Sequence, residues 1–336
     1  IDTSTAKIKQ AIIDKGGSVG DLTTYAAAIA SLPSGGGEAD PNPTAEKNDV
    51  TFYDYDGTIR YSYTAAEFLA LTEMPPLPTQ KGLVCQEWNW SYEDAKDYVA
   101  EYGILDVGAI YITDDGKTRL YIRIAANGRM DVPLCFQQTI ANGVTIDWGD
   151  GSPTETLDGT GNVNTTHRYA SIGDYMISLD VADGCTLSLG HNTQEYCVMG
   201  EVGAIYGVRL YKLEIGKNST SLKNYSLYNC YSMASVTLPA TISELGSYTF
   251  QNCYSLGSLV IPKSVTSTGF YSLGFCYSLG SLVIPNSMKS IGGYTLYPNK
   301  ARSSLIIPKS VTSIGAAAFA DGIGTGYYDF SHHTVV

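Results

Sequence analysis

Residues 235–256 read SVTLPATISELGSYTFQNCYSL, and residues 258–279 repeat the pattern as SLVIPKSVTSTGFYSLGFCYSL. Two further copies follow, SLVIPNSMKSIGGYTLYPNK at 281–300 and SLIIPKSVTSIGAAAFADG at 304–322. Four equally spaced prolines mark the period: Pro239, Pro262, Pro285 and Pro308. A repeat of this length cannot bury its apolar side alone and must stack on its neighbours. The sequence therefore predicts a C-terminal solenoid that presents an extended surface.

Apolar residues alternate ahead of each proline, which predicts a short strand that ends where proline lacks a backbone N–H. The same phase extends back to Leu213 and Ile215 and forward to Tyr328 and Phe330, which gives six rungs. A second column with the same spacing is expected to line the inner wall: Leu227, Phe250, Leu273, Leu296 and Phe319. We expect the strands of successive rungs to form one parallel sheet.

The repeat pattern, L-x-IP-x-SVTSIG-x-x-AF-x-x-C-x-SL, resembles the BspA-like leucine-rich repeats of bacterial surface proteins over residues 205–331. The resemblance implies an extracellular, non-enzymatic protein, and several members of that family are thought to be adhesins. It supplies no catalytic residue. The fourth unit departs from the pattern, because YPNKARSS stands where NCYSL is expected.

Composition narrows the possible partners. The 336 residues carry a net charge of −12, which argues against nucleic acid and anionic membrane surfaces as ligands. No apolar run approaches the ~18 residues that a membrane-spanning helix needs. Of seven cysteines, three share one column of the repeats and are expected in the core, namely Cys230, Cys253 and Cys276. The other four cysteines are scattered and expected to be reduced, with Cys185 and Cys197 the only plausible disulfide pair, and no pattern indicates a metal or a cofactor.

The fold class that we expect is a multidomain α+β/β protein. Its five segments are a helical docking segment at 1–32, a flexible linker at 33–48, a small α+β unit at 49–118, a β-sandwich at 119–183 and the leucine-rich-repeat solenoid at 184–336. The first segment is too small to hold a core of its own. It loosely resembles the starts of tail and appendage proteins of gut phages, which implies self-association or attachment to a particle.

The α+β unit contains two Asp-Gly turns, at Asp56-Gly57 and Asp115-Gly116, and each predicts a β-hairpin. Residues 65–74 predict a short helix. A longer helix is expected at 91–103, with Ser91 at the N-cap and Asp94 three residues later.

The same unit contains a motif that resembles the D-x-D-G-T nucleophile loop of haloacid-dehalogenase-type phosphatases. It consists of Asp54, Asp56, Gly57 and Thr58, with Asp114 and Asp115 as a second acidic pair. That chemistry requires a nucleophilic aspartate, an acid/base aspartate and clustered carboxylates around Mg²⁺. An alternating strand follows the motif at once, so a hairpin turn is favoured over an enzyme.

Residues 119–183 resemble polycystic-kidney-disease-type (PKD) domains, which are small β-sandwiches. The matching residues are Trp148, Gly149, Asp150, Gly151, His167, Tyr169, Gly173 and Tyr175. Asp147 and Asp150 are candidates for a cation site, but aspartates in short turns more often cap backbone amides. His167 is expected to be a structural hydrogen-bonding residue.

Tyrosine is the remaining candidate for function, since the chain has 26 tyrosines and only 8 phenylalanines. Two rows recur with the period of the prolines: Tyr225, Tyr248, Tyr271 and Tyr294, and then Tyr231, Tyr254 and Tyr277. Stacked rungs hold such rings ~5 Å apart, and rigid amphipathic rings suit recognition surfaces. The rings are proposed as the ligand surface. In the alternative they merely shield an apolar flank, and a competing ligand surface is the outer sheet face around Val260, Val283 and Ile306.

Two functions of the binding class follow. One is a bacterial surface adhesin whose repeats contact a host or bacterial surface protein or glycan. The other is a phage or prophage appendage component that attaches through residues 1–32 and carries a receptor-binding tip. The repeats favour the first, whereas the docking segment and the lack of a recognisable anchoring signal favour the second.

Overall fold

The computed structural model describes residues 48–125, 130–191, 196–201, 209–299 and 305–320. The chain divides into two compact units, Ile1–Asp40 and Pro41–Val336, and every described residue belongs to the second. The predicted helical segment at 1–32, the linker up to residue 47 and the expected last rung at 328–330 lie outside the described residues.

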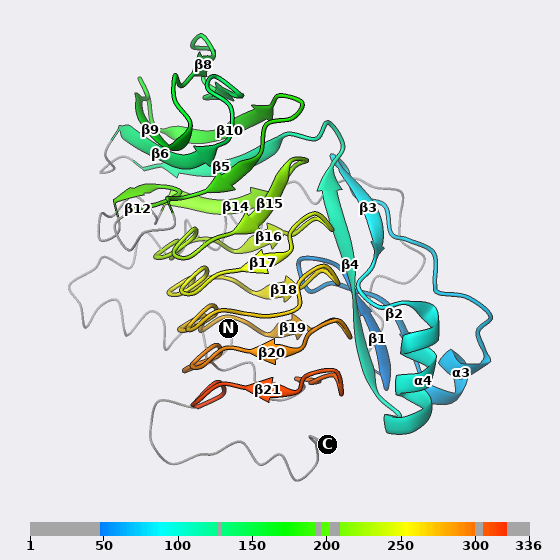
Figure 1. Cartoon of the computed structure of the whole chain (residues 1–336). Coiled ribbons are helices and arrows are strands. Elements are labelled where there is room, and N and C mark those ends of the chain that lie inside the picture. The colour runs from blue at the N-terminus through cyan, green and yellow to red at the C-terminus, as the bar shows by residue number, and fades with distance from the viewer. Residues whose placement is uncertain (1–47, 126–129, 192–195, 202–208, 300–304, 321–336) are drawn as a thin grey trace. The chain divides into compact units, whose positions relative to one another are not determined.

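A four-stranded sheet forms the α+β unit, with the strand order β2-β1-β4-β3 (Figure 1). Its strands are β1 (Val50–Tyr53), β2 (Ile59–Tyr63), β3 (Leu83–Trp88) and β4 (Leu105–Thr113). The first predicted hairpin is confirmed, because β1 and β2 pair antiparallel and the Gly57 amide donates to the Asp54 carbonyl at 3.1 Å. β4 is parallel to β1. β3, which the sequence analysis did not predict, is antiparallel to β4.

Both predicted helices of this unit are present, as α3 (Ala65–Ala70) and α4 (Tyr92–Tyr102). Ser91 caps α4 as expected, since its side chain accepts a hydrogen bond from the Asp94 amide at 3.1 Å. α4 ends at Gly103, whose left-handed φ of 74° is a conformation that glycine adopts without strain. The helices cover a core that contains Phe52, Phe68 and Trp88.

The second predicted hairpin was wrong. The chain does turn at Asp115-Gly116, where the Gly116 amide donates to the Thr113 carbonyl at 3.2 Å. The flanking strands then enter different sheets: β4 lies between β1 and β3, and β5 (Thr118–Ile124) lies between β14 and β10. β4 is buried at all but one of its positions, so it needs a partner on both edges, which a two-stranded hairpin does not provide.

Two larger sheets follow, with the strand orders β16-β14-β5-β10-β7-β8 and β17-β15-β11-β6-β9. Seven of these eleven strands lie within residues 118–189: β5 and then β6 (Asp131–Gln138), β7 (Val144–Asp147), β8 (Glu155–Thr156), β9 (Gly161–Arg168), β10 (Gly173–Val181) and β11 (Leu187–Leu189). A separate small hairpin consists of β12 (Tyr196–Cys197) and β13 (Gly200–Glu201). Facing residues of the two sheets, among them Leu120, Phe136 and Trp148, share one core.

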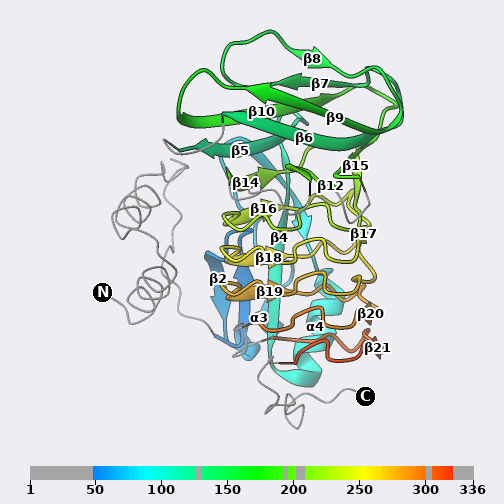
Figure 2. The same cartoon turned by 90° about the vertical axis from the view of Figure 1, so that its left-hand side faces the viewer.

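These sheets continue into the repeats (Figures 1 and 2). The first repeat contributes β14 (Leu210–Glu214) and β15 (Ser219–Leu222), which pair with β5 and β11. The buried core is therefore continuous from Leu120 to Phe319. The end of a repeat array needs a cap, because the terminal repeat otherwise exposes its apolar interior. Here the two sheets of residues 118–189 cover that end.

The prediction of one parallel sheet in the repeats was wrong, because the strands of the repeats form two rows. The row before the prolines holds β14, β16 (Ser235–Thr237), β18 (Ser258–Val260) and β19 (Ser281–Val283). The row after them holds β15, β17 (Glu244–Leu245), β20 (Ser290–Ile291) and β21 (Ser313–Ile314). After the prolines the chain turns back and becomes extended again, with Leu245 and Ile291 buried. These short strands pair in parallel with the equivalent strand of another repeat.

The predicted inner columns are confirmed. Leu227, Phe250, Leu273, Leu296 and Phe319 are each at most 5% exposed. The cysteine column is also buried, and burial raises the pKa of the Cys276 thiol to about 12. Asn299 occupies the next place in that column: its amide donates to the Leu273 carbonyl at 2.8 Å, as Cys276 donates to Phe250 at 3.2 Å. All seven cysteines are free thiols in the structure.

The α+β unit packs along the strand row before the prolines. Tyr53 and Ile110 of its sheet form a buried cluster with Val260 and Val283 of the repeats. The approach is close: a Cβ at Gly108 would lie 2.2 Å from a methyl carbon of Val260. Hydrogen bonds from Asn89 to the Ile261 carbonyl and from Trp90 to the Ile284 carbonyl, both of 3.1 Å, fix the position of the unit.

Candidate ligand surfaces

The first tyrosine row, Tyr225, Tyr248, Tyr271 and Tyr294, is a stack of rings. Ring centroids are 4.6 Å apart between Tyr225 and Tyr248, with planes 6° from parallel. The next two intervals are 5.7 Å at 14° and 4.7 Å at 15°. All four side chains are half-buried. Because each inner ring is covered on both faces by its neighbours, this row offers mainly ring edges and hydroxyl groups to solvent.

The backbone of this row is left-handed, with φ between 52° at Tyr271 and 61° at Tyr248. That conformation costs a side-chain-bearing residue roughly 1 kcal/mol. A buried hydrogen bond fixes the turn, because the Thr249 hydroxyl donates to the Gly246 carbonyl at 2.8 Å. Stacked ring pairs contribute about 0.5–1.5 kcal/mol each. The stack thus offsets much of its own backbone cost and is rigid before any ligand arrives.

The second tyrosine row is more open. Its rings are 4.9 Å apart between Tyr231 and Tyr254 and 5.2 Å apart between Tyr254 and Tyr277, with planes tilted by 31° and 32°. Tyr254 is 39% exposed and Tyr277 is 41% exposed, which confirms that this row points outward. Desolvation and neighbouring tyrosines raise the pKa of Tyr254 above its usual value of 10, so it stays a neutral phenol at physiological pH.

Two phenylalanines complete this surface, and sequence reasoning missed both. Phe275 lies 6.3 Å from the Tyr271 ring and 6.1 Å from the Tyr277 ring, so it joins the two rows. Phe270 contacts the first row and is 40% exposed. Both are departures from the repeat, in which position 270 is otherwise Asn, Ser, Gly or Ala and position 275 is otherwise Asn, Pro or Asp. We call the two tyrosine rows together with Phe270, Phe275 and Tyr297 the aromatic face.

The aromatic face lies in a stretch of chain with almost no charge. Between Tyr225 and Tyr297, the first and last residues of the aromatic face, the only charged residues are Glu244, Lys263 and Lys289. Lys263 belongs to the other side of the repeat, where its ammonium pairs with the Glu87 carboxylate at 2.5 Å. The stretch that forms the aromatic face thus carries few charged residues, which favours an uncharged ligand.

The competing surface, the outer face of the strand row before the prolines, is occupied by the chain itself. Val260 and Val283 are at most 4% exposed beneath Tyr53 and Ile110. Ile306 packs against the core of the α+β unit. This face is therefore closed to an external ligand as long as that unit stays in place.

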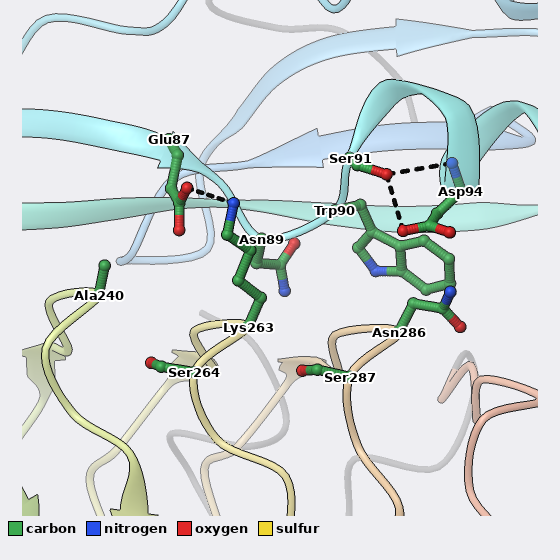
Figure 3. A pocket seen from close by; sticks show the side chains of 10 residues that line it. All are labelled: Glu87, Asn89, Trp90, Ser91, Asp94, Ala240, Lys263, Ser264, Asn286 and Ser287. Carbon is green, nitrogen blue, oxygen red and sulfur yellow. Dashed lines mark hydrogen bonds and ion pairs between the residues drawn. The ribbon is translucent and has the colours of Figure 1, made fainter.

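A groove of ≈ 580 Å³ runs between the α+β unit and the turns that follow the prolines (Figure 3). Its lining consists of Glu87, Asn89, Trp90, Ser91, Asp94, Ala240, Lys263, Ser264, Asn286 and Ser287. Most of its polar groups already bind protein: Glu87 pairs with Lys263, Ser91 donates to Asp94 at 2.7 Å, and Asn89 donates to the Ile261 carbonyl. We interpret the groove as the edge of the interface between the α+β unit and the repeats.

The structure does not assemble the phosphatase-like residues into a site. The Asp54 carboxylate is buried, and it accepts hydrogen bonds from Arg60 at 2.8 Å and from Gln80 at 2.6 Å. Tyr53 is paired with Gly108, so Asp114 lies five residues beyond the position opposite Asp54, roughly 16 Å away at ~3.3 Å per residue. Asp114 is bound instead by Arg119, at 2.8 Å.

The turn at 147–152 has the structural role that its sequence predicts. Asp147 accepts a hydrogen bond from the Gly149 amide at 2.9 Å, and Asp150 accepts one from the Ser152 amide at 3.0 Å. The His167 ring lies 2.8 Å from the Asp150 carboxylate and stacks on Trp148. Hydrogen bonds from Ser152 and then from His167 lower the pKa of Asp150 to about 2. The aspartates are thus turn caps.

The described ranges hold neither a metal cluster nor a membrane span of helical type. Within them, no group of three or more His, Cys, Asp or Glu side chains lies close enough to hold a metal ion. Neither described helix has the length and apolarity that crossing a bilayer requires.

Comparison with known proteins supports the assignment of the repeats. Residues 202–323 match the BspA type leucine rich repeat region in six copies. This part of the chain carries BspA-type leucine-rich repeats. No curated protein matches the sequence. The resemblances of 119–183 to PKD domains and of 1–32 to phage proteins remain predictions.

Similar solved structures are leucine-rich repeat proteins. One from Bacteroides ovatus ATCC 8483 is 30% identical, with a TM-score of 0.30 over 32% of this chain and 27% of that one. The T. pallidum leucine rich repeat protein is 26% identical, with a TM-score of 0.30 over 32% and 51%. A leucine rich cell surface protein from Faecalibacterium prausnitzii A2-165 is 24% identical, with a TM-score of 0.28 over 34% and 37%. The chain thus spans between 27% and 51% of the length of these proteins.

Proposed function

We propose that this chain is a non-enzymatic binding protein that acts outside the cell or on its surface. Its repeats present the aromatic face to a protein or glycan ligand, with the seven tyrosines of the two rows as contact residues. BspA-type repeats are typical of surface proteins, and this supports the proposed location.

One observation carries the proposal: the aromatic face is continuous and rigid over four consecutive repeats. Its rows are connected through Phe275, and its first row is held in a left-handed backbone. Rigid aromatic side chains lose little conformational entropy on binding, which is why they dominate recognition surfaces.

The second candidate, a phage or prophage appendage component, depends on residues 1–32. These residues lie outside the described part of the chain, so no structural observation favours that candidate. Neighbouring genes would distinguish the two, since tail or holin genes indicate a phage and secretion genes indicate a surface protein.

The test is a binding screen of the full chain against glycan and surface-protein arrays. The variant changes Tyr248, Tyr271 and Tyr254 to Ser together, and the control changes Ile172 to Ser, which is 57% exposed and far from the repeats in sequence. We expect the triple variant to lose binding with an unchanged circular dichroism spectrum. Full binding by a folded triple variant would place the ligand elsewhere.

A further inference from the structure

We propose that Phe270 is the centre of the ligand site and that the site takes an uncharged saccharide. This inference rests on the function proposed above, and it adds the ligand class and a residue that the two tyrosine rows do not include.

The position of Phe270 departs from the repeat in a way that the surrounding structure accommodates. The equivalent residues of the neighbouring repeats are Ser247, Gly293 and Ala316. The Phe270 ring leans over Gly293, where an added Cβ would lie 3.1 Å from two of its ring carbons. A glycine in the next repeat thus makes room for the ring. The ring nevertheless stays partly open to solvent, because 40% of the residue is exposed.

The ring is held in one orientation by the first tyrosine row. Its centroid lies 5.9 Å from Tyr248, 4.7 Å from Tyr271 and 5.3 Å from Tyr294, and all three contacts are of the edge type, at 69°, 82° and 67°. The tyrosines stack in parallel on one another, whereas Phe270 stands across three of them. Three ring contacts fix an exposed apolar ring that would otherwise be mobile, and such preorganisation lowers the entropic cost of binding.

These surroundings match the chemistry of a neutral sugar ring. A pyranose has an apolar C–H face bordered by hydroxyl groups, so it is recognised by an aromatic ring with hydrogen-bonding groups beside it. Phe270 supplies the ring, and the half-buried tyrosines at its edge supply phenol hydroxyls that donate and accept. An acidic saccharide would need several Lys or Arg residues, whereas between Tyr225 and Tyr297 the chain holds only Lys263, which pairs with Glu87, and Lys289. An apolar peptide anchor would need a recess, whereas Phe270 is itself the exposed ring.

The repeat itself provides the matched variants. Phe270→Ser introduces the residue found at position 247, and Phe275→Asn introduces the residue found at 229 and 252. Each substitution is therefore compatible with the turn in which it stands. Ile172→Ser is the control for loss of an exposed apolar side chain elsewhere. The probes are soluble neutral oligosaccharides (gluco-, manno- and galacto-configured) and two acidic polymers, polygalacturonate and heparin, titrated against the full chain by isothermal calorimetry.

We expect the wild-type chain to bind at least one neutral oligosaccharide and neither acidic polymer. Phe270→Ser should weaken that binding at least about tenfold, as loss of a central aromatic anchor does, while Phe275→Asn has a smaller effect and Ile172→Ser has none. The inference is overturned if no neutral saccharide binds, if an acidic polymer binds better, or if only a protein ligand is found. It also fails if Phe270→Ser leaves saccharide binding unchanged. In that case the tyrosine triple variant tests the proposed function separately. Loss of binding in that variant supports the proposed function, whereas unchanged binding contradicts the proposed function as well.

Discussion

Replacement of Phe250 by Ala should destabilise the whole repeat array. Phe250 is fully buried in the inner column between Leu227 and Leu273, and its amide donates to the Ser272 carbonyl of the next repeat at 2.8 Å. Truncation removes a large side chain from two repeat interfaces at once. Loss of a buried Phe costs about 3–5 kcal/mol of the free energy of unfolding, and the upper part of this range applies because a rigid stack cannot collapse around the cavity.

Tyr254→Ala is the matched control from the same repeat. Tyr254 is 39% exposed, and its contacts are two tilted ring pairs at 4.9 and 5.2 Å. Its loss should cost about 1–2 kcal/mol. The measurement is urea unfolding of the full chain by circular dichroism, with the free energy extrapolated to zero denaturant. Equal losses for the two variants, or a larger loss for Tyr254→Ala, would refute the assignment of inner and outer columns.

Three further predictions concern other parts of the chain. Proteinase K should cut first within 34–47 and leave a resistant fragment that starts near residue 48, since Gly/Pro-rich linkers are cleaved before packed repeats; first cleavage inside the repeats would contradict the linker. Gly108→Ala should destabilise by about 1–3 kcal/mol, because its Cβ would lie 2.2 Å from Val260, and a second change of Val260 to Ala should restore much of the loss in a double-mutant cycle. The pKa of Asp150 is lowered from 3.8 to about 2 in the folded state, so its contribution to stability is present above pH ~4 and is lost as the pH falls toward 2. Asp150→Asn should therefore reduce the acid dependence of thermal unfolding over that range, and an unchanged profile would show that the hydrogen bonds of Asp150 with Ser152 and His167 contribute nothing to stability.

The repeat period determined more than the fold class. A side chain that recurs once in every repeat must occupy the same place in each turn, so the burial of the Leu227–Phe319 column and the exposure of Tyr254 followed from spacing alone. The Ser91 cap of α4 and the Asp54–Thr58 turn followed from local chemistry, since their hydrogen bonds join residues close in sequence.

Strand pairing was less accessible to sequence reasoning. β3 carries mixed side chains and is only partly buried, so its pattern gives little signal. The partners of β4 and β5 are distant in sequence, and the strong turn between them suggested a hairpin that does not form. Phe270 and Phe275 had a usable signal, because no other repeat has an aromatic residue at either position.

The sequence by itself thus determined the stacked repeats, the inner columns and the two tyrosine rows, because these depend on period and on neighbours one repeat away. Only the tertiary structure decided which outer surface is free. The sequence pattern is the same whether solvent, a ligand or another part of the chain covers the apolar column of Val260, Val283 and Ile306. The packing of the α+β unit buries Val260 and Val283 through Gly108 and Ile110 and partly buries Ile306, whereas the aromatic face stays open. Such a contact joins residues about 150 positions apart, and neither side shows it in its own pattern.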